Sequence, residues 1–432
     1  MKDLKIAGLR LPLFLIVSAV ALVACLLKVI PPNMVGAFLL LILFGELLNL
    51  VGNHLPIIRS FFGGGPIVVI FGGAALVYFG IITPELKQVS DQFMKDPGGF
   101  LDFYIAALIT GSILGMNREL LVKAAIRFLP TIIAGVLVAI GLTALVGPLV
   151  GIPSGQAIAK ICIPIMGGGM GAGAVPISKV FAGALKIPAD QILSELVPAV
   201  ALGNAMAIVA GGLLDKLGKI KPNWTGNGQM MANGYFEVTD SDATGKDMTL
   251  SDYMVGIVIA TAFFTWGCIV SYFFKEVFFF KFNLHPYAWM IISVAVVKAL
   301  NIMPTEIEHA SSGWYKFVAE NFTAALMLGI GVSYTSMAQI ISAFTIQYVV
   351  LCAIVVIGAI IGTALFGKLV GFNPIEAAIT SGLCMANMGG TGDVAVLTAS
   401  HRMELMPFAQ ISSRLGGAFI IFLASILVPI FF

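Results

Sequence analysis

Long apolar stretches separated by short polar ones run the whole length of the chain. A helix that crosses a bilayer needs about 20 mostly apolar residues, and eleven stretches of that kind are present. They lie near residues 11–30, 33–52, 64–83, 99–116, 129–151, 195–214, 253–273, 286–303, 314–334, 346–368 and 408–432. The pattern predicts an all-α polytopic membrane protein with about eleven transmembrane helices.

Two further apolar stretches, at about 156–186 and 374–400, do not fit a continuous helix, because each has a glycine cluster at its centre. Glycine costs up to about 1 kcal/mol at an interior helix position, and proline about 3 kcal/mol. Non-helical backbone at membrane depth is tolerated only where protein or water satisfies its polar groups. We therefore predict that both stretches turn back at mid-membrane as re-entrant hairpins whose tips meet.

The chain also contains an internal repeat. The nine residues from Thr143 agree with the nine from Thr363 at seven positions, and the eight from Gly168 agree with the eight from Gly389 at five. The predicted units, 33–214 and 253–432, each hold five spans and one hairpin. An odd number of spans inverts the second unit relative to the first, as in secondary transporters. Residues 1–32 form an extra N-terminal helix, and residues 215–252 form a polar loop.

The hairpin tips are candidate binding elements. The start of a half-helix exposes N–H groups that favour a carboxylate, and freed carbonyl groups can hold a small cation. The first tip offers mainly backbone groups, at Gly168, Gly169, Met170 and Gly171. The second adds the side chains of Asn387, Thr391 and Asp393. Close helix packing is the alternative role for such glycines. A loose dinucleotide-binding fingerprint at 390–395 is disfavoured, because it needs a soluble βαβ unit.

Arg414 stands inside the last predicted span. A charge at the centre of a transmembrane helix costs at least about 2.5–3.5 kcal/mol and usually marks function, and the arginine fork matches a carboxylate. Arg414 is therefore a candidate substrate ligand. The alternatives are a structural partner such as Asp393 or snorkelling to the interface. Asn204 and Asn321 are weaker candidates, and we expect Lys298 to snorkel.

Composition and charge narrow the class of protein. Of 432 residues, 59% are hydrophobic and 11% charged, against roughly 25% charged in soluble domains. A water-soluble or disordered chain is thereby excluded, and long continuous apolar runs disfavour a β-barrel. A net charge of +2 gives no reason to expect a nucleic-acid partner. The five cysteines have neither ligand nor disulfide spacing, so we expect no cofactor and no metal beyond a coupling ion.

The distribution of lysine and arginine predicts the orientation. Most of these residues fall on the cytoplasmic side when the N-terminus and the loop at 215–252 are placed in the cytoplasm. The N-terminal run, which reaches Cys25, also resembles a signal peptide. Its length and the many spans that follow favour a transmembrane helix instead.

Three segments, residues 167–176, 385–393 and 409–417, resemble the motifs of the bacterial 2-hydroxycarboxylate transporter family. The resemblance covers essentially the whole chain. It implies two inverted repeats with two re-entrant hairpins and a homodimer in the bacterial inner membrane. It also implies an elevator mechanism, in which a transport domain that carries the hairpins slides along a fixed dimerisation domain.

The same resemblance implies roles for individual residues. Those implied to bind substrate are Arg414, Gly389, Gly390, Thr391, Gly392, Gly169, Met170, Gly171 and Ser413. Those implied to bind a cation are Asn387, Met385, Asp393 and Gly168. The coupling ion is Na+ or H+, because oxygen ligands suit sodium and Asp393 can equally carry a proton.

Two positions depart from the pattern of the family's citrate symporters. Met388 stands where those carriers place a second substrate-binding arginine, and Met170 where they place an asparagine. Loss of one cation and one amide favours a dicarboxylate such as malate over citrate. The leading hypothesis is a malate symporter coupled to Na+ or H+. A malate/lactate exchanger, a citrate symporter and an ion channel are the alternatives. An enzyme ranks last, because no nucleophile–base set or cofactor lysine is recognisable.

Overall fold

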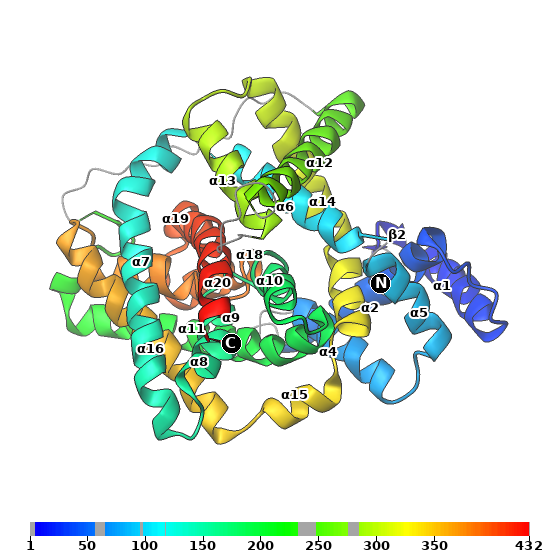
Figure 1. Cartoon of the computed structure of the whole chain (residues 1–432), viewed down its shortest axis with the longest axis horizontal. Helices are drawn as coiled ribbons and strands as arrows, with labels where there is room; N and C mark the ends of the chain where they lie inside the picture. Colours follow the sequence, from blue (N-terminus) through cyan, green and yellow to red (C-terminus); the bar gives the residue numbers. More distant parts are fainter. Residues whose placement is uncertain are drawn as a thin grey trace.

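A computed structural model of the chain describes residues 5–56, 65–95, 98–116, 118–231, 248–274 and 285–431 (Figure 1). Within helices, the side chains at 119–126, 171, 172, 339, 343, 390 and 391 lie outside this description. So does much of the predicted polar loop, residues 232–247. Two strands, β1 (Lys5–Ile6) and β2 (Leu9–Arg10), pair antiparallel at the start of the described chain.

The remaining elements are helices. In the first half they are α1 (Leu11–Leu26), α2 (Met34–His54), α4 (Gly65–Tyr78), α5 (Pro84–Met94), α6 (Phe100–Leu114), α7 (Arg118–Leu149), α8 (Ser154–Ala157), η1 (Ile158–Cys162), α9 (Ile163–Ile165), η2 (Met170–Ala174), α10 (Val175–Leu185), α11 (Ala189–Ile220) and η3 (Pro222–Trp224). In the second half they are α12 (Leu250–Tyr272), α13 (Pro286–Ala299), α14 (Thr305–Ser333), α15 (Met337–Ala343), α16 (Ile346–Leu369), α17 (Pro374–Ala377), η5 (Ala378–Leu383), α18 (Gly390–Ala399), η6 (Met403–Leu405), α19 (Met406–Ile411), η7 (Ser412–Gly416) and α20 (Gly417–Phe431).

These helices are those of a multi-pass membrane protein. By length and composition, six in the described chain suffice to cross a membrane: α2, the part of α7 from Arg127, α11, α12, α16 and the run from Met403 to Phe431. Shorter apolar helices include α1, α4, α6, α10 and α13. Each predicted span overlaps a helix, α14 included. The count of eleven spans, the inverted repeat and the domain bounds stay predictions.

Sequence analysis missed two helices, α5 and α15. Both are shorter than a span, and α5 is polar on one face. Thr83 begins α5, because its hydroxyl accepts a hydrogen bond from the backbone N–H of Leu86 at 3.4 Å. The helix buries Val89, Phe93 and Met94. Phe93 stacks on Phe100 of α6, with ring centroids 4.5 Å apart.

The helices pack into two groups. Helices α2, α4, α5, α6, α12, α13 and α14 contact one another and form what we term the support group. The site group consists of α7, α11, α16, α17–α20 and the segments from α8 to α10. Figure 1 shows the site group around α20 and the support group beside and above it. Each group takes helices from both predicted repeats.

Small residues allow close approach within the site group. In α16, Gly358 faces Ala139 of α7, and Gly362 faces the carbonyl of Ala134. A side chain at either glycine would collide with α7 backbone, since a Cβ there would lie within 2.7 Å of it. Small residues at such crossings let helix backbones pack closely in a membrane.

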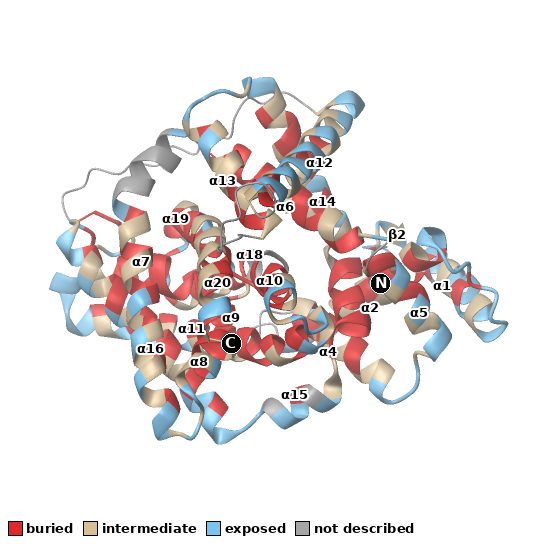
Figure 2. Cartoon of the chain, in the orientation of Figure 1, coloured by how far each residue is buried: buried red, intermediate tan, exposed pale blue. Residues whose placement is uncertain are grey.

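Burial separates the interior from two outer helices. Helices α1 and α12 present exposed apolar residues along much of their length (Figure 2), among them Leu15, Ile16 and Val20 on α1. An exposed apolar surface of this extent is unusual in a soluble monomer, and it suits contact with lipid.

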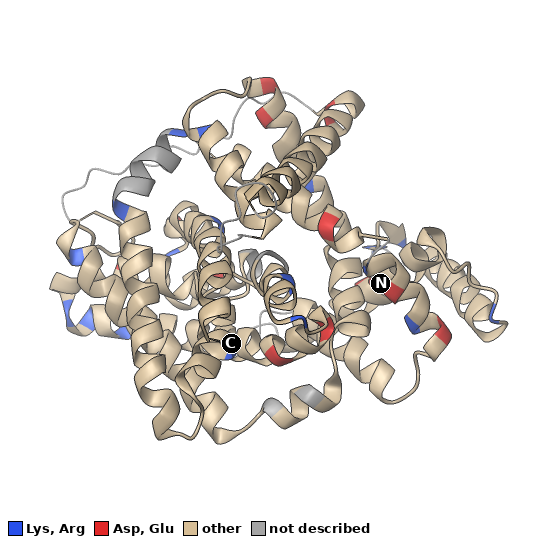
Figure 3. Cartoon of the chain, viewed as in Figure 1, with Lys and Arg blue, Asp and Glu red and all other residues tan. Residues whose placement is uncertain are grey.

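Few charges occur within the packed helices (Figure 3), but one cluster is buried. The Arg402 guanidinium donates to Glu376 at 3.0 Å and to Asp215 at 2.9 Å. The Thr225 hydroxyl and the Gly226 N–H also donate to Glu376, at 2.7 and 2.9 Å. This cluster ties α17 and the end of α18 to α11 and the segment after it, so it holds both ends of the second interrupted stretch.

The expectation that Lys298 snorkels is wrong. Its side chain is buried, and its Nζ lies 2.7 Å from Oε2 of Glu308 on α14. An interior carboxylate ten residues further along the chain removes the need to reach water, because a buried charge is tolerated when it is paired.

Replacing Arg402 by methionine tests the buried cluster. Arg402→Met leaves Glu376 and Asp215 without their shared cation, and an uncompensated buried charge costs about 3–5 kcal/mol. We expect the melting temperature in detergent to fall by several degrees. Lys219→Gln is the control, because Lys219 pairs with the same Asp215 but its side chain is 71% exposed, and such a pair is worth at most about 1 kcal/mol. Equal melting temperatures for the two variants would contradict the assignment.

Candidate substrate and cation site

Both interrupted stretches break where their glycines lie. The first stretch is helical to Ile165 and again from Met170, with φ of 74° at Gly168 and 121° at Gly169. The second is helical to Leu383 and again from Gly390. Side chains rarely adopt positive φ, so glycine is required at such a turn. The predicted interruptions are thus present, while the placement of the tips within a membrane stays a prediction.

The two tips touch through their backbones. A Cβ built on Gly169 would lie 2.7 Å from the carbonyl oxygen of Met388, and one on Gly168 would lie 2.5 Å from the carbonyl oxygen of Ser413. A Cβ on Gly389 would meet the carbonyl oxygen of Gly168 at 3.2 Å. Side chains at Gly168 and Gly169 would therefore push apart three segments that are distant in sequence.

A cavity of about 570 Å³ lies beside the tips. Seven predicted site residues line it: Gly168, Gly169, Met170, Gly389, Asp393, Ser413 and Arg414. The facing wall comes from the support group, through residues that include Asn49, Tyr104, Ser112, Tyr315 and Thr323. The site therefore lies where the two groups meet.

Asp393 is the buried carboxylate of the site. It accepts hydrogen bonds from the Asn387 amide at 2.9 Å and from the Ser413 hydroxyl, which is 2.9 Å from each carboxylate oxygen. The Ser413 hydroxyl also lies 3.0 Å from the carbonyl oxygen of Cys384. Asn387 in turn accepts from the N–H of Gly389 at 2.7 Å. These oxygen atoms, around a carboxylate that no described cation pairs, are a donor set suited to a hard cation or a proton.

Arg414 reaches the cavity from η7, a π-helical turn. Its Nη1 donates to the carbonyl oxygen of Ser112 at 3.2 Å, and its guanidinium lies 5.7 Å from the ring centroid of Tyr315. Within the part of the chain that the structure describes, Arg414 forms no ion pair, so Asp393 is not its structural partner. A guanidinium has five N–H donors, and one bond to a carbonyl leaves capacity for a carboxylate.

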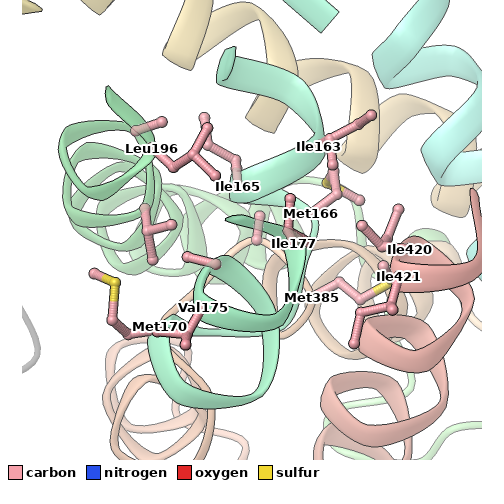
Figure 4. Close-up of a cluster of buried hydrophobic side chains, with 14 of the residues drawn as sticks. Ile163, Ile165, Met166, Met170, Val175, Ile177, Leu196, Met385, Ile420 and Ile421 are labelled. Atoms are coloured by element: carbon pink, nitrogen blue, oxygen red, sulfur yellow. The ribbon is translucent and has the colours of Figure 1, made fainter. Parts of the chain in front are cut away.

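Three predicted residues lie behind the cavity wall. Asn387 acts through Asp393, as described above. A Cβ on Gly392 would lie 2.7 Å from Oδ1 of Asn204. Met385 belongs to an apolar cluster with Met166, Ile420 and Ile421 (Figure 4). Its side chain is therefore a packing element, and its role as a cation ligand stays a prediction.

For three further predicted residues the structure describes the backbone alone. Gly390 and Thr391 begin α18, and Gly171 lies in η2. The Thr391 hydroxyl is outside the described atoms. Its role as a substrate ligand stays a prediction.

The weaker candidates differ in outcome. Asn204 accepts a hydrogen bond from the backbone N–H of Met388 at 3.0 Å and so fixes the second tip. Its amide nitrogen is buried without a hydrogen-bond partner among the described atoms. Asn321 donates to the carbonyl oxygen of Phe317 at 2.8 Å on an exposed face, and it does not line the cavity.

Sequence analysis missed the support-group wall of the site. Ser112 and Tyr315 hold Arg414, and the Tyr104 hydroxyl bonds to Thr323 at 2.7 Å. The only sequence signal for this wall was the presence of polar residues inside predicted spans. That signal did not single out these residues, because they carry no motif and lie far from Arg414 in the sequence, Ser112 by 302 positions.

Π-helical turns surround the site. They are η1, η2, η5 and η7. Such turns are rare and occur frequently at functional sites. Here they occur in both interrupted stretches and in the turn that carries Arg414, which marks this region independently of the cavity.

Comparison with known proteins identifies the family. The model of the 2-hydroxycarboxylate transporter family matches residues 6–426. The chain is 37% identical to the citrate/sodium symporter of Salmonella typhimurium over 426 residues, 98% of this chain and 94% of that protein. It is 37% identical to the malate transporter MleP of Lactococcus lactis subsp. lactis over 435 residues, 100% of this chain and 99% of that protein. It is 36% identical to the citrate transporter CitP of Leuconostoc mesenteroides over 428 residues, 98% of this chain and 94% of that protein. The resemblance stated from the motifs is confirmed.

A single methyl group tests the contact between the tips. Gly169→Ala places a Cβ against the Met388 carbonyl at a φ of 121°, so the tips must separate. We expect a melting temperature in detergent several degrees below that of the parent. The matched control is Gly183→Ala in α10, where a Cβ meets nothing within 4 Å and alanine favours the helix. Equal melting temperatures for Gly169→Ala and Gly183→Ala would show that the tips are not in contact.

Proposed function

The chain belongs to the 2-hydroxycarboxylate transporter family, and we propose that it is a secondary active transporter that carries malate in symport with Na+ or H+. The family and the names of the relatives make it a transporter rather than an enzyme. The substrate, the coupling ion and the mechanism are the proposed part.

One observation carries the choice of substrate. Arg414 is the one lysine or arginine among the described residues that line the cavity. It lines the same cavity as the tips, where η2 and α18 begin and their N–H groups favour negative charge. The guanidinium can hold one carboxylate, and the two helix starts, whose tips are in backbone contact, together form the place for a second. Met388, which also lines the cavity, adds no charge for a third.

The surroundings of Asp393 support cation coupling. Oxygen atoms of Ser413, Asn387 and the Cys384 carbonyl lie near this buried carboxylate, and Asp393 itself lines the cavity. A cation or proton at Asp393 would lower the cost of bringing a dianion to the same cavity. The name citrate/sodium symporter, carried by relatives, supports Na+.

The proposal includes the mechanism and the assembly. The residues implied to bind substrate come from the site group, while the facing wall belongs to the support group. That division supports an elevator mechanism, in which the site group moves with its ligands along the support group. We further propose a homodimer in the bacterial inner membrane with the N-terminus in the cytoplasm.

Citrate is the second candidate substrate. Relatives at 36–37% identity are named for citrate as well as for malate, so overall similarity does not separate them. The missing charge at Met388 is the feature that favours malate.

Uptake by purified protein in proteoliposomes tests the function. We expect accumulation of labelled malate, stronger than that of citrate, when a Na+ gradient or a pH gradient is imposed. Imposing the two gradients separately identifies the coupling ion. Citrate uptake without malate uptake or competition would overturn the malate assignment, and the absence of uptake of either would overturn the function.

Arg414→Ala tests the substrate ligand. A hydrogen bond to a charged group contributes about 1.5–3 kcal/mol, so we expect affinity for malate to fall about 10- to 100-fold. Arg118→Ala is the matched control, because the Arg118 side chain also donates to a carbonyl oxygen, that of Ala299 at 3.0 Å, away from the cavity. Unchanged malate affinity in Arg414→Ala, measured by calorimetry, would remove Arg414 from the site.

A further inference from the structure

We propose that two ion pairs between the groups, Lys95–Asp190 and Lys179–Asp102, form a lock that closes one face of the transporter while the substrate cavity is open at the other. The inference rests on the proposed function, because a lock has meaning only if the site group moves. It names residues that lie outside the substrate and cation site.

Each ion pair joins one residue of the support group to one residue of the site group. Lys95 directly follows α5 and Asp102 lies in the first turn of α6, both in the support group. Asp190 lies in the first turn of α11 and Lys179 on α10, both in the site group. Lys95 Nζ is 3.0 Å from Asp190 Oδ2, and Lys179 Nζ is paired with Asp102 Oδ1.

Further hydrogen bonds add to the ion pairs at the same face. The Ser194 hydroxyl of α11 donates to the carbonyl oxygen of Tyr334 at 3.0 Å and accepts from the N–H of Ser336 at 2.8 Å, just beyond α14. The Tyr287 hydroxyl of α13 donates to the same oxygen of Asp102 that pairs with Lys179. The contacts between the groups thus involve α6, the residues just beyond α14 and the end of α5, while Tyr287 of α13 fixes Asp102 from within the support group.

The lock lies at one end of the substrate cavity, and the cavity extends from there along the same helices. In α6 the cavity is lined from Tyr104, two residues after Asp102 of the lock, to Ile113, eleven residues or about 16 Å after it. In α14 the cavity is lined from Tyr315 to Met327, and Tyr334 at the lock follows Met327 by seven residues, just beyond the helix end at Ser333. At the cavity level the lining residues Asn53, Glu320 and Gln410 are exposed. With the N-terminus in the cytoplasm, the lock is at the outer face.

The exposure of the lock suits a contact that opens in every cycle. The side chains of Lys95 and Asp190 are 30% and 36% exposed, and those of Lys179 and Asp102 are 19% and 22% exposed. When the pairs separate, water can hydrate these charged groups and replace the lost ion-pair contacts. A fully buried pair like Arg402–Glu376, at 3% and 0%, loses far more on separation. It lies inside the site group, where no separation is needed.

Reversible cross-linking tests the lock. Lys95→Cys with Asp190→Cys is prepared in a background without the native cysteines and reconstituted in proteoliposomes. A short, reducible, thiol-specific cross-linker should lower malate uptake at least about tenfold, and reductant should restore it. Lys179→Cys with Asp102→Cys provides a second, independent pair and is expected to behave in the same way.

The control pair is Lys160→Cys with Glu195→Cys. These residues form an ion pair of 2.7 Å with similarly exposed side chains, but η1 and α11 both belong to the site group. Cross-linking them should leave uptake within about twofold. Undiminished uptake after complete cross-linking of either lock pair, or equal inhibition in the control, would overturn the lock. Uptake before cross-linking shows that the transport function itself holds.

Discussion

The backbone contact between the two interrupted stretches is the constraint on which the site depends. Gly168 and Gly169 approach the backbones of Ser413 and Met388 more closely than any side chain would permit. This approach brings two helix starts, Asp393 and the turn that carries Arg414 to one cavity. The contact requires glycine for two reasons at once, positive φ and lack of space. Few substitutions are therefore compatible with it.

Sequence reasoning predicted the features that carry a local signature. Glycine clusters within apolar runs located both breaks, and a lone charge in a span located Arg414. The wall formed by Ser112 and Tyr315 was not predictable, because tertiary packing alone brings these residues to the arginine. Met385 was assigned to the cation by resemblance, yet its side chain packs among apolar neighbours. Π-helical turns add a second difficulty: each shifts the helix face by one residue, so apolar periodicity no longer identifies which side chains point inward.

Charged side chains differ in burial and in pairing at three places in the molecule. The cluster of Arg402, Glu376 and Asp215 is buried and fully partnered, as a permanent tie must be. The pairs that join the two groups are partly exposed. In the cavity, Arg414 and Asp393 are near one another in the fold but form no ion pair in the described chain. Neither residue is paired with an opposite charge there, which is what the proposed site for an anion and a cation requires.

The tip-to-tip contact also bears on how such a pocket diverges. One wall consists largely of backbone, at Gly168, Gly169 and Gly389. These positions have no side chain that substitution could vary without separating the tips. The opposite wall consists of side chains such as Asn49, Tyr104 and Thr323, on helices that do not carry the tips. Variation in ligand size can arise in that wall, and also at the tip side chains Met170 and Met388, which line the cavity. Two carriers with identical glycine motifs can therefore select different acids, and motif identity alone is a poor guide to the cargo.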